Sequence, residues 1–102
     1  MKVLFICSKN QWRSPTAEKI FHEVNGLHVR SAGTEKGPRI KVTSGHIGWA
    51  DAIFVMEQKH MRRLKTQFGQ ELAGKYLWNL DIPDDYSFMD EELVEILKAR
   101  VE

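Results

Sequence analysis

The sequence predicts an α/β fold, a small three-layer domain with a four-stranded parallel sheet and a phosphate-binding loop after the first strand. Short apolar runs rich in β-forming residues alternate along the chain with amphipathic segments of helical period. This alternation is typical of a parallel sheet covered by helices. The chain has 102 residues, of which 42% are hydrophobic and 28% are charged, as expected for one soluble globule. We therefore expect a single domain over residues 1–102.

The first strand and the first helix are predicted near the N-terminus. Residues 2–6 form a short apolar run of the kind that is buried on both faces of a parallel sheet. Ser14 is expected to cap the following helix, with Pro15 at its first position, and Asn25-Gly26 is expected to end it. Four apolar residues have the spacing of a helix that buries one face: Ala17, Ile20, Phe21 and Val24.

The remaining elements follow in the same alternating order. They are a strand over 27–32, a polar connection over 34–49, a strand over 52–56, a helix with Met61, Leu64 and Phe68 on one face, a strand over 76–80 and a last amphipathic helix over 89–101. Ligands of such sheets bind at the carboxyl ends of the strands. The loops expected to form a site begin at Cys7, Gly33, Glu57 and Asp81.

The loop from Cys7 to Arg13 holds the most informative motif of the chain, a C-x5-R-S sequence between the first strand and the first helix. A loop in this place can aim several backbone N–H groups at one point, and the helix N-terminus adds partial positive charge there. Such a concavity binds a phosphate-sized anion and favours thiolate over thiol. Arg13 can clamp two phosphate oxygens. The residues expected around the phosphate are Ser8, Lys9, Asn10, Gln11, Trp12 and Arg13.

This motif predicts a cysteine-dependent phosphatase with Cys7 as the nucleophile. The other interpretation is that Cys7 merely ends a buried strand, because free cysteine is among the most buried residue types. The strand before it and the helix after it favour the catalytic interpretation.

A second catalytic group is expected in residues 81–86, which follow the last predicted strand and hold three carboxylates beside Pro83. A thiolate that attacks phosphorus needs a proton donor for the departing oxygen, typically worth 10²–10⁴-fold in rate. This loop should emerge at the same sheet edge as Cys7. The alternative, a solvated acidic turn before a helix, stays open on composition alone.

Composition limits the other functions. A net charge of +1 gives no bulk electrostatic case for nucleic acid or membrane partners. A lone cysteine allows no intrachain disulfide and fits a reducing compartment, and the N-terminal apolar run is too short for a signal peptide. We therefore expect a cytoplasmic protein. The four histidines show no metal-ligand spacing and nucleotide-binding motifs are missing from the sequence, so no metal and no cofactor is expected.

Several segments together resemble the low-molecular-weight protein tyrosine phosphatases. That family typically opens with a hydrophobic strand, C-x-G-N-x-C-R-S-P and then A-E in the helix, which resembles residues 3–18 here. Residues 31–34, S-A-G-T, and 51–56, D-A-I-F-V-M, resemble its second and third strands. Residues 81–86 resemble its I-P-D-P-Y stretch. The loop motif is specific and the other segments support it.

The resemblance implies a role for individual positions. Cys7 would form a phosphocysteine intermediate, and Arg13 would hold the phosphate oxygens as charge spreads over them. Ser14 would donate a hydrogen bond to the Cys7 sulfur and ease its departure in the second step. Asn10 would brace the loop in a left-handed conformation. Asp84 aligns with the general acid of the family.

Some assignments in the acid loop stay open. Asp81 and Asp85 are rivals of Asp84 for the role of general acid, and Asp85 stands where the family has proline. Tyr86 is expected to flank the entrance to the site together with Asp85, and the alternative for Tyr86 is an ordinary half-buried tyrosine.

The sequence also departs from the family pattern. Lys9 replaces the glycine of the family loop, and Trp12 replaces its second cysteine, which can form a protective disulfide with the nucleophile. The chain is shorter than usual mainly after Gly33, where the family has a further helix and a loop-bracing histidine. By alignment Gly37 lies near that histidine, and His46 and His60 are the candidates to replace it.

The resemblance implies a compact enzyme that hydrolyses phosphomonoesters in two steps without a metal, with phosphotyrosine in a phosphorylated protein, or a small phosphomonoester, as the substrate. Asn10-Gln11 also resembles the loop of a related phosphatase acting on the tail of RNA polymerase II, so phosphoserine stays open. The alternatives are an arsenate reductase that uses an external thiol and a non-catalytic module that binds phosphate or phosphopeptides. The sequence does not decide the oligomeric state.

Overall fold

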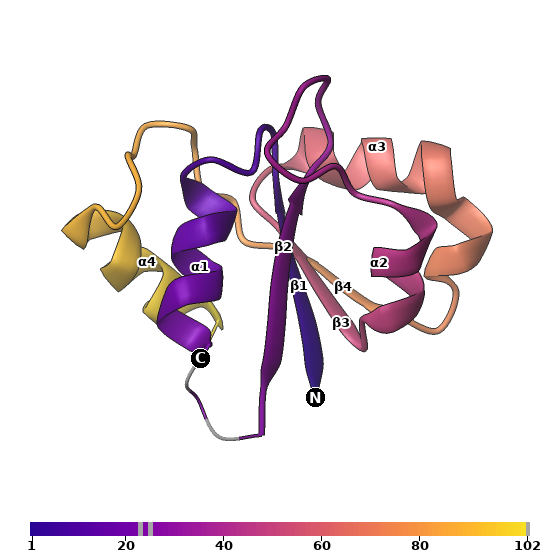
Figure 1. Cartoon of the computed structure of the whole chain (residues 1–102), viewed down its shortest axis with the longest axis horizontal. Helices are drawn as coiled ribbons and strands as arrows, with labels where there is room; N and C mark the ends of the chain where they lie inside the picture. The colour runs from indigo at the N-terminus through magenta and orange to yellow at the C-terminus, as the bar shows by residue number, and fades with distance from the viewer. Residues whose placement is uncertain (23, 25, 102) are drawn as a thin grey trace.

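The four strands form one parallel sheet in the order β2-β1-β3-β4 (Figure 1). The computed structural model describes every residue except 23, 25 and 102. The strands are β1 (Lys2–Cys7), β2 (His28–Gly33), β3 (Ala52–Val55) and β4 (Tyr76–Asn79). β1 pairs with β2 on one side and with β3 on the other, so it is central in the sheet. The predicted fold class, α/β with four parallel strands, is confirmed.

Helices cover both faces of the sheet and make three layers (Figure 1). The two helices on one face are α1 (Arg13–Phe21) and α4 (Glu91–Val101). The other face holds α2 (Ser44–Trp49), α3 (Gln58–Phe68) and the 3-10 turn η1 (Gly69–Leu72). Among the described residues, no helix combines the length and the apolar character needed to span a bilayer.

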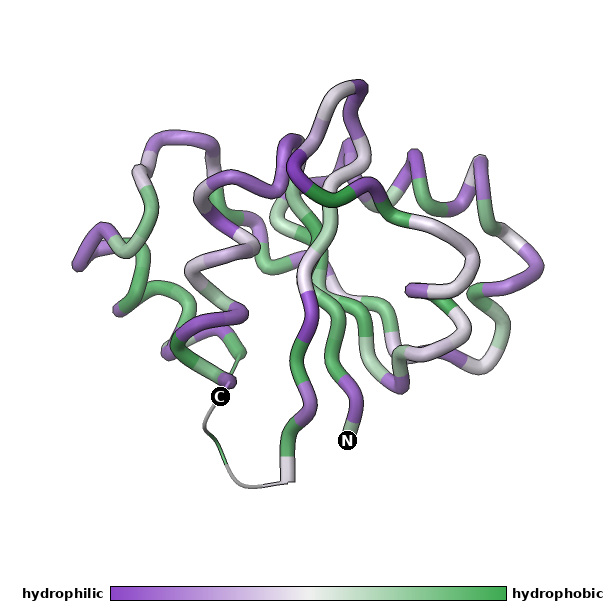
Figure 2. The backbone as a smooth tube through the Cα atoms, in the orientation of Figure 1, coloured by the Kyte–Doolittle hydropathy of each residue, from purple (hydrophilic) through white to green (hydrophobic). Residues whose placement is uncertain are grey.

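Alternation along β1 divides the core into two clusters. Val3, Phe5 and Cys7 face α1 and α4, whereas Leu4 and Ile6 face α2 and α3. All five side chains are buried, because successive residues of a strand point to opposite faces and both faces of this sheet are covered. Figure 2 shows the resulting run of hydrophobic residues along the central strand. The Cys7 sulfur therefore ends on the α1 side of the sheet.

The predicted limits of the first helix are wrong at both ends. α1 begins at Arg13 with Trp12 as its N-cap, so Ser14 does not cap it and Pro15 is its third residue. The hydroxyl of Ser14 instead contacts the Cys7 sulfur. α1 ends at Phe21, and Val24 is exposed. Of the predicted Asn25-Gly26 stop, Asn25 lies outside the described residues.

The predicted polar connection over 34–49 contains a helix. α2 occupies its last part, where the Thr43 side chain accepts a hydrogen bond from the His46 N–H. Ile47 is the buried residue of this one-and-a-half-turn helix. Its sequence, S-G-H-I-G-W, has two glycines and a single aliphatic residue, so it has no helical period for a sequence-based prediction to detect.

Candidate active site

A small pocket lies where the loop after β1 turns into α1. Its volume is about 40 Å³, and it is lined by residues of that loop and by one residue of the segment after β4: Cys7, Ser8, Lys9, Gln11, Trp12, Arg13 and Asp84. The loop wraps around the pocket because β1 delivers Cys7 and α1 delivers Arg13 to the same sheet edge. The N-terminus of α1 thus points its partial positive charge toward the sulfur.

A chain of hydrogen bonds orients the hydroxyl of Ser14 toward Cys7. Asn10, in the left-handed conformation that the resemblance implied (φ 56°), donates from Nδ2 to the Oγ atoms of Ser14 and Ser31, each at 2.8 Å. Ser14 Oγ lies 3.0 Å from Cys7 Sγ, and because a thiolate can only accept, Ser14 is the donor whenever Cys7 is ionised. The Ser31 hydroxyl in turn donates a hydrogen bond to Glu18 Oε1. Ser14 is therefore arranged as a donor to the sulfur.

Arg13 is buried with one end of its guanidinium group occupied. Nη1 donates to Glu57 Oε2 at 2.5 Å and to the carbonyl of Ile82 at 2.8 Å. The Nε and Nη2 atoms have only long contacts, 3.6 Å to Asp84 and 3.5 Å to Ser8, which are at or beyond the limit of a hydrogen bond. The fork formed by Nε and Nη2 is thus left to bind two oxygens of an anion.

Glu57, which follows β3, is a site residue that the sequence analysis did not single out. Desolvation raises the pKa of this carboxyl, but the hydrogen bond and the charge of Arg13 outweigh it, so the pKa lies below its ordinary value. Glu57 is consequently ionised and neutralises the buried arginine. The sequence signal was its place at the carboxyl end of a strand, where one of the four expected site loops begins.

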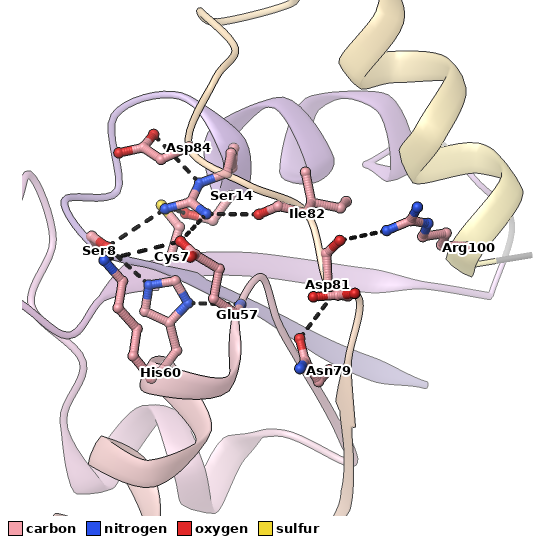
Figure 3. A network of polar contacts seen from close by, with 12 residues as sticks. Cys7, Ser8, Ser14, Glu57, His60, Asn79, Asp81, Ile82, Asp84 and Arg100 are labelled. Carbon is pink, nitrogen blue, oxygen red and sulfur yellow. Dashed lines mark hydrogen bonds and ion pairs between the residues drawn. The ribbon is translucent and has the colours of Figure 1, made fainter.

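His60 braces the loop from the α3 side. Its Nδ1 accepts the Glu57 N–H at 3.0 Å, so the ring hydrogen is on Nε2 and is donated to Ser8 Oγ at 2.9 Å. Burial and the nearby Arg13 lower the pKa of His60 from 6.5 to about 4, and the ring is neutral at neutral pH. Ser8 Oγ accepts from His60, so the hydroxyl hydrogen of Ser8 is free to donate into the pocket. Figure 3 shows this network from Ser8 through His60 to Glu57.

Of the three carboxylates after β4, Asp84 is the one that lines the pocket. Its side chain is half exposed and its Oδ1 lies 3.6 Å from Arg13 Nε. Asp81 instead belongs to the turn that leaves the sheet, with a φ of 57°. Neither Asp85 nor Tyr86 lines the pocket, and Tyr86 packs against the α1–α4 core. Their predicted place at the entrance stays a prediction.

The other predicted loop residues take different positions. Trp12 is half exposed and forms one wall of the pocket. The ammonium group of Lys9 donates to the carbonyl of Lys36, which ties the loop to the connection after β2. Asn10 is buried behind the pocket and does not line it. Within the described part of the chain, no cluster of three histidine, cysteine or acidic residues could hold a metal ion.

A known family matches the N-terminal part of the chain, which holds this loop. The family described as "Low molecular weight phosphotyrosine protein phosphatase" matches residues 2–48. A comparison with curated proteins finds no match. Solved structures of the same architecture include the YwlE arginine phosphatase from Geobacillus stearothermophilus, with a TM-score of 0.75, 20% identity, and coverage of 95% of this chain and 88% of that chain. The chain has the low-molecular-weight phosphatase fold.

Two further structures with this fold are similar to the same extent. The tyrosine phosphatase Wzb from Escherichia coli K30, in complex with phosphate, has a TM-score of 0.75 and 20% identity over 97% of this chain and 91% of its own. SP-PTP, a low molecular weight protein tyrosine phosphatase from Streptococcus pyogenes, has a TM-score of 0.75 and 19% identity over 96% of this chain and 86% of its own. The resemblance to the low-molecular-weight phosphatases that the sequence predicted is confirmed.

Proposed function

We propose that this chain is a cysteine-dependent phosphomonoester hydrolase that acts through a phosphocysteine intermediate, with protein phosphotyrosine as the substrate. The observation that carries the proposal is that Cys7, the open fork of Arg13 and the carboxyl group of Asp84 line one and the same pocket. A nucleophile, an anion clamp and a proton donor are the three parts that metal-free phosphoryl transfer to an enzyme requires.

In the first step the Cys7 thiolate attacks phosphorus and the bond from phosphorus to the ester oxygen breaks. Arg13 Nε and Nη2 hold two equatorial oxygens, while Glu57 and Ile82 keep Nη1 fixed. The leaving oxygen takes a proton from Asp84, which becomes a carboxylate. The product alcohol or phenol leaves and the phosphoryl group stays on sulfur.

In the second step water attacks the phosphocysteine. Asp84, now a carboxylate, takes a proton from that water, the sulfur–phosphorus bond breaks, and inorganic phosphate is released. The departing thiolate receives the hydrogen bond of Ser14, 3.0 Å from the sulfur. The relay through Asn10 fixes the direction of that bond, so Ser14 is assigned the role of stabilising the leaving thiolate.

The structures with this fold have different substrates, so the order in which substrates are tested is argued from the pocket wall. Wzb and SP-PTP are described as tyrosine phosphatases and YwlE as an arginine phosphatase. The half-exposed wall of Trp12 beside the pocket offers a flat apolar contact for a phenol ring. Phosphotyrosine is therefore the first substrate to test, and phosphoarginine is the second.

The test compares hydrolysis of p-nitrophenyl phosphate, a phosphotyrosine peptide and phosphoarginine by the wild type and three variants. Cys7→Ser and Arg13→Ala should abolish turnover. Asp84→Asn should lower the rate on the phosphotyrosine peptide about 10²-fold or more, in the range of a lost general acid. If Asp84→Asn is silent, Asp81→Asn and Asp85→Asn are the next variants, since the acid then lies elsewhere in the loop.

The same samples separate the alternatives. Binding of phosphate without turnover of any of the three substrates would contradict the proposal and favour a phosphopeptide-binding module. Oxidation of an added thiol that depends on arsenate would favour an arsenate reductase with an external thiol.

A further inference from the structure

The segment that bears Asp84 leaves β4 through a left-handed turn. Asp81 has a φ of 57°, a left-handed conformation that is unfavourable for most non-glycine residues and that aspartate tolerates better than most. The Asp81 N–H is bonded to Asn79 Oδ1 at 2.8 Å. The Leu80 N–H still donates to Val55 and the Ile82 N–H to Met56. The turn therefore keeps its amides bonded while the chain bends away from the sheet.

The carbonyl groups of this turn are bonded to a residue from the other end of the chain. Arg100, in the last turn of α4, donates from Nη1 to the carbonyls of Leu80 at 2.8 Å and of Asp81 at 2.5 Å. Such charge-assisted bonds are about twice as strong as neutral ones. Figure 3 shows Arg100 reaching from α4 to Asp81.

A second arginine holds the next carbonyl. Arg13 Nη1 donates to Ile82 at 2.8 Å, so three consecutive carbonyls, from Leu80 to Ile82, are bonded to guanidinium groups. Pro83 then links Ile82 to Asp84 with a fixed φ. The only ion pair of Asp84 among the described residues is its 3.6 Å contact with Arg13. The orientation of Asp84 thus depends mainly on the backbone before it.

We propose that Arg100 is a positioning residue for the general acid, acting on Asp84 through the carbonyls of Leu80 and Asp81. The inference rests on the proposed function for the role of Asp84. Arg100 is exposed and lies outside the pocket, so it touches no reacting atom. Its loss releases the turn, and Asp84 then spends less time within reach of the leaving oxygen.

The kinetic test compares Arg100→Met with Lys98→Met, a matched loss of one positive charge in the same last turn of α4. Proton donation matters more for phenyl phosphate than for p-nitrophenyl phosphate, because phenoxide is the poorer leaving group. Arg100→Met should lower the rate on phenyl phosphate about 10-fold and the rate on p-nitrophenyl phosphate less than about threefold, a part of the full effect of the acid. Lys98→Met should leave both rates unchanged.

Two further variants separate positioning from a general structural effect. Arg100→Lys should recover most of the lost rate, since one ammonium group can donate to both carbonyls. In an Asp84→Asn background, Arg100→Met should add no further loss, because both changes then act through the same group. Equal losses on the two esters, or additive losses in the double variant, would overturn the proposal.

Amide hydrogen exchange provides a readout that needs no turnover. The amides of Leu80, Asp81 and Ile82 are hydrogen-bonded and should exchange about 10-fold faster in Arg100→Met but not in Lys98→Met. Unchanged exchange would overturn the positioning role whatever the activity. A wild-type protein that hydrolyses none of the esters would instead overturn the proposed function, and the exchange result would still decide whether Arg100 holds the turn.

Discussion

At the residue scale, Arg13 gives the pocket two hydrogen-bond donors, Nε and Nη2, that suit an anion. Its side chain is 2% exposed, and a buried charge is costly unless it is paired and hydrogen-bonded. Glu57 and the Ile82 carbonyl satisfy Nη1, but Nε and Nη2 keep contacts of 3.5 Å or more. Two oxygens of a phosphate group would complete the hydrogen bonding of the buried arginine, so binding energy is concentrated at the reacting group.

His60 makes stability depend on pH. Its pKa is about 4 in the folded protein against 6.5 for an ordinary histidine, so between these values the unfolded chain binds a proton that the folded chain does not. Stability is then complete above pH 6.5 and falls as the pH drops toward 4, by up to about 3 kcal/mol from this residue. In a His60→Gln variant the free energy of unfolding in urea should lose that part of its pH dependence.

The matched control for this measurement is His28→Gln, at an exposed position on β2. This variant should keep the wild-type slope between pH 4 and pH 6.5. If His60→Gln and the wild type gave parallel curves over that range, the neutral, buried state assigned to His60 would be wrong.

At the element scale, the end of β2 is fitted against the Cys7 loop. A Cβ atom at Gly33 would lie 2.6 Å from the Ser8 carbonyl oxygen and 3.1 Å from the Asn10 nitrogen. Both are backbone atoms of the Cys7 loop, so the loop would have to shift to make room for the methyl group. Gly33→Ala should therefore destabilise the protein by about 1–3 kcal/mol, as overpacking does. It should also weaken the binding of inorganic phosphate at least about 10-fold, because displaced amides lose their aim at the anion.

Calorimetric titration of phosphate and urea unfolding check this expectation. Gly48→Ala is the control, since nothing lies within 4 Å of its added methyl group and it sits within α2. That variant should bind phosphate normally and be at least as stable as the wild type. Normal phosphate binding by Gly33→Ala would mean that the loop is not held by the end of β2.

The elements differ in how far they could be predicted from the sequence. The strands were predictable from their short apolar runs, and α1, α3 and α4 from apolar residues at helical spacing. The Cys7 loop was predictable because its residue types have a defined chemistry at a fixed spacing. The start of α1 was predicted wrongly. Serine is a common helix N-cap, but the hydroxyl of Ser14 is bonded to Asn10 and Cys7 instead. The capping rule fails at this position because the candidate site uses the same hydroxyl oxygen for its contact with Cys7.

Contacts between elements were the other part that sequence reasoning could not reach. Glu57 and His60 look like an ordinary start of a helix, and the capping box they form is indeed present. Their second contacts, to Arg13 and to Ser8, depend on β3 lying next to β1. Strand order is not encoded in periodicity, so the part of Glu57 in the site follows only from the structure, whereas the resemblance had already made His60 a candidate to brace the loop.

At the scale of the whole molecule, the site is assembled from segments that are far apart in the chain. Residues 7–13, 57–60 and 80–84 follow β1, β3 and β4, which are adjacent and parallel, so their ends meet at one edge. α4 then returns along the α1 face and brings Arg100 to the turn before Asp84. The C-terminal helix thereby links the end of the chain to the pocket.

The whole chain also contains only one cysteine, and this determines its response to oxidation. Peroxide converts a reactive thiolate to sulfenic acid, which a neighbouring thiol can trap as a disulfide before further oxidation. Trp12 stands where a second loop cysteine would lie in related phosphatases, and Cys7 has no intramolecular partner. We therefore expect sulfinic and sulfonic acid at Cys7 and irreversible inactivation after prolonged exposure to peroxide.

Mass spectrometry of Cys7 and residual phosphatase activity after dithiothreitol treatment measure this outcome. Brief exposure should be largely reversible, because sulfenic acid is reduced by thiols, and prolonged exposure should not. A Trp12→Cys variant is the matched test, since it restores a thiol five residues from Cys7 in the same loop. That variant should form an internal disulfide and keep recoverable activity under the oxidation that destroys the wild type. Full recovery of the wild type after prolonged strong oxidation would contradict the expectation, because it would require protection that a single cysteine in this loop does not provide.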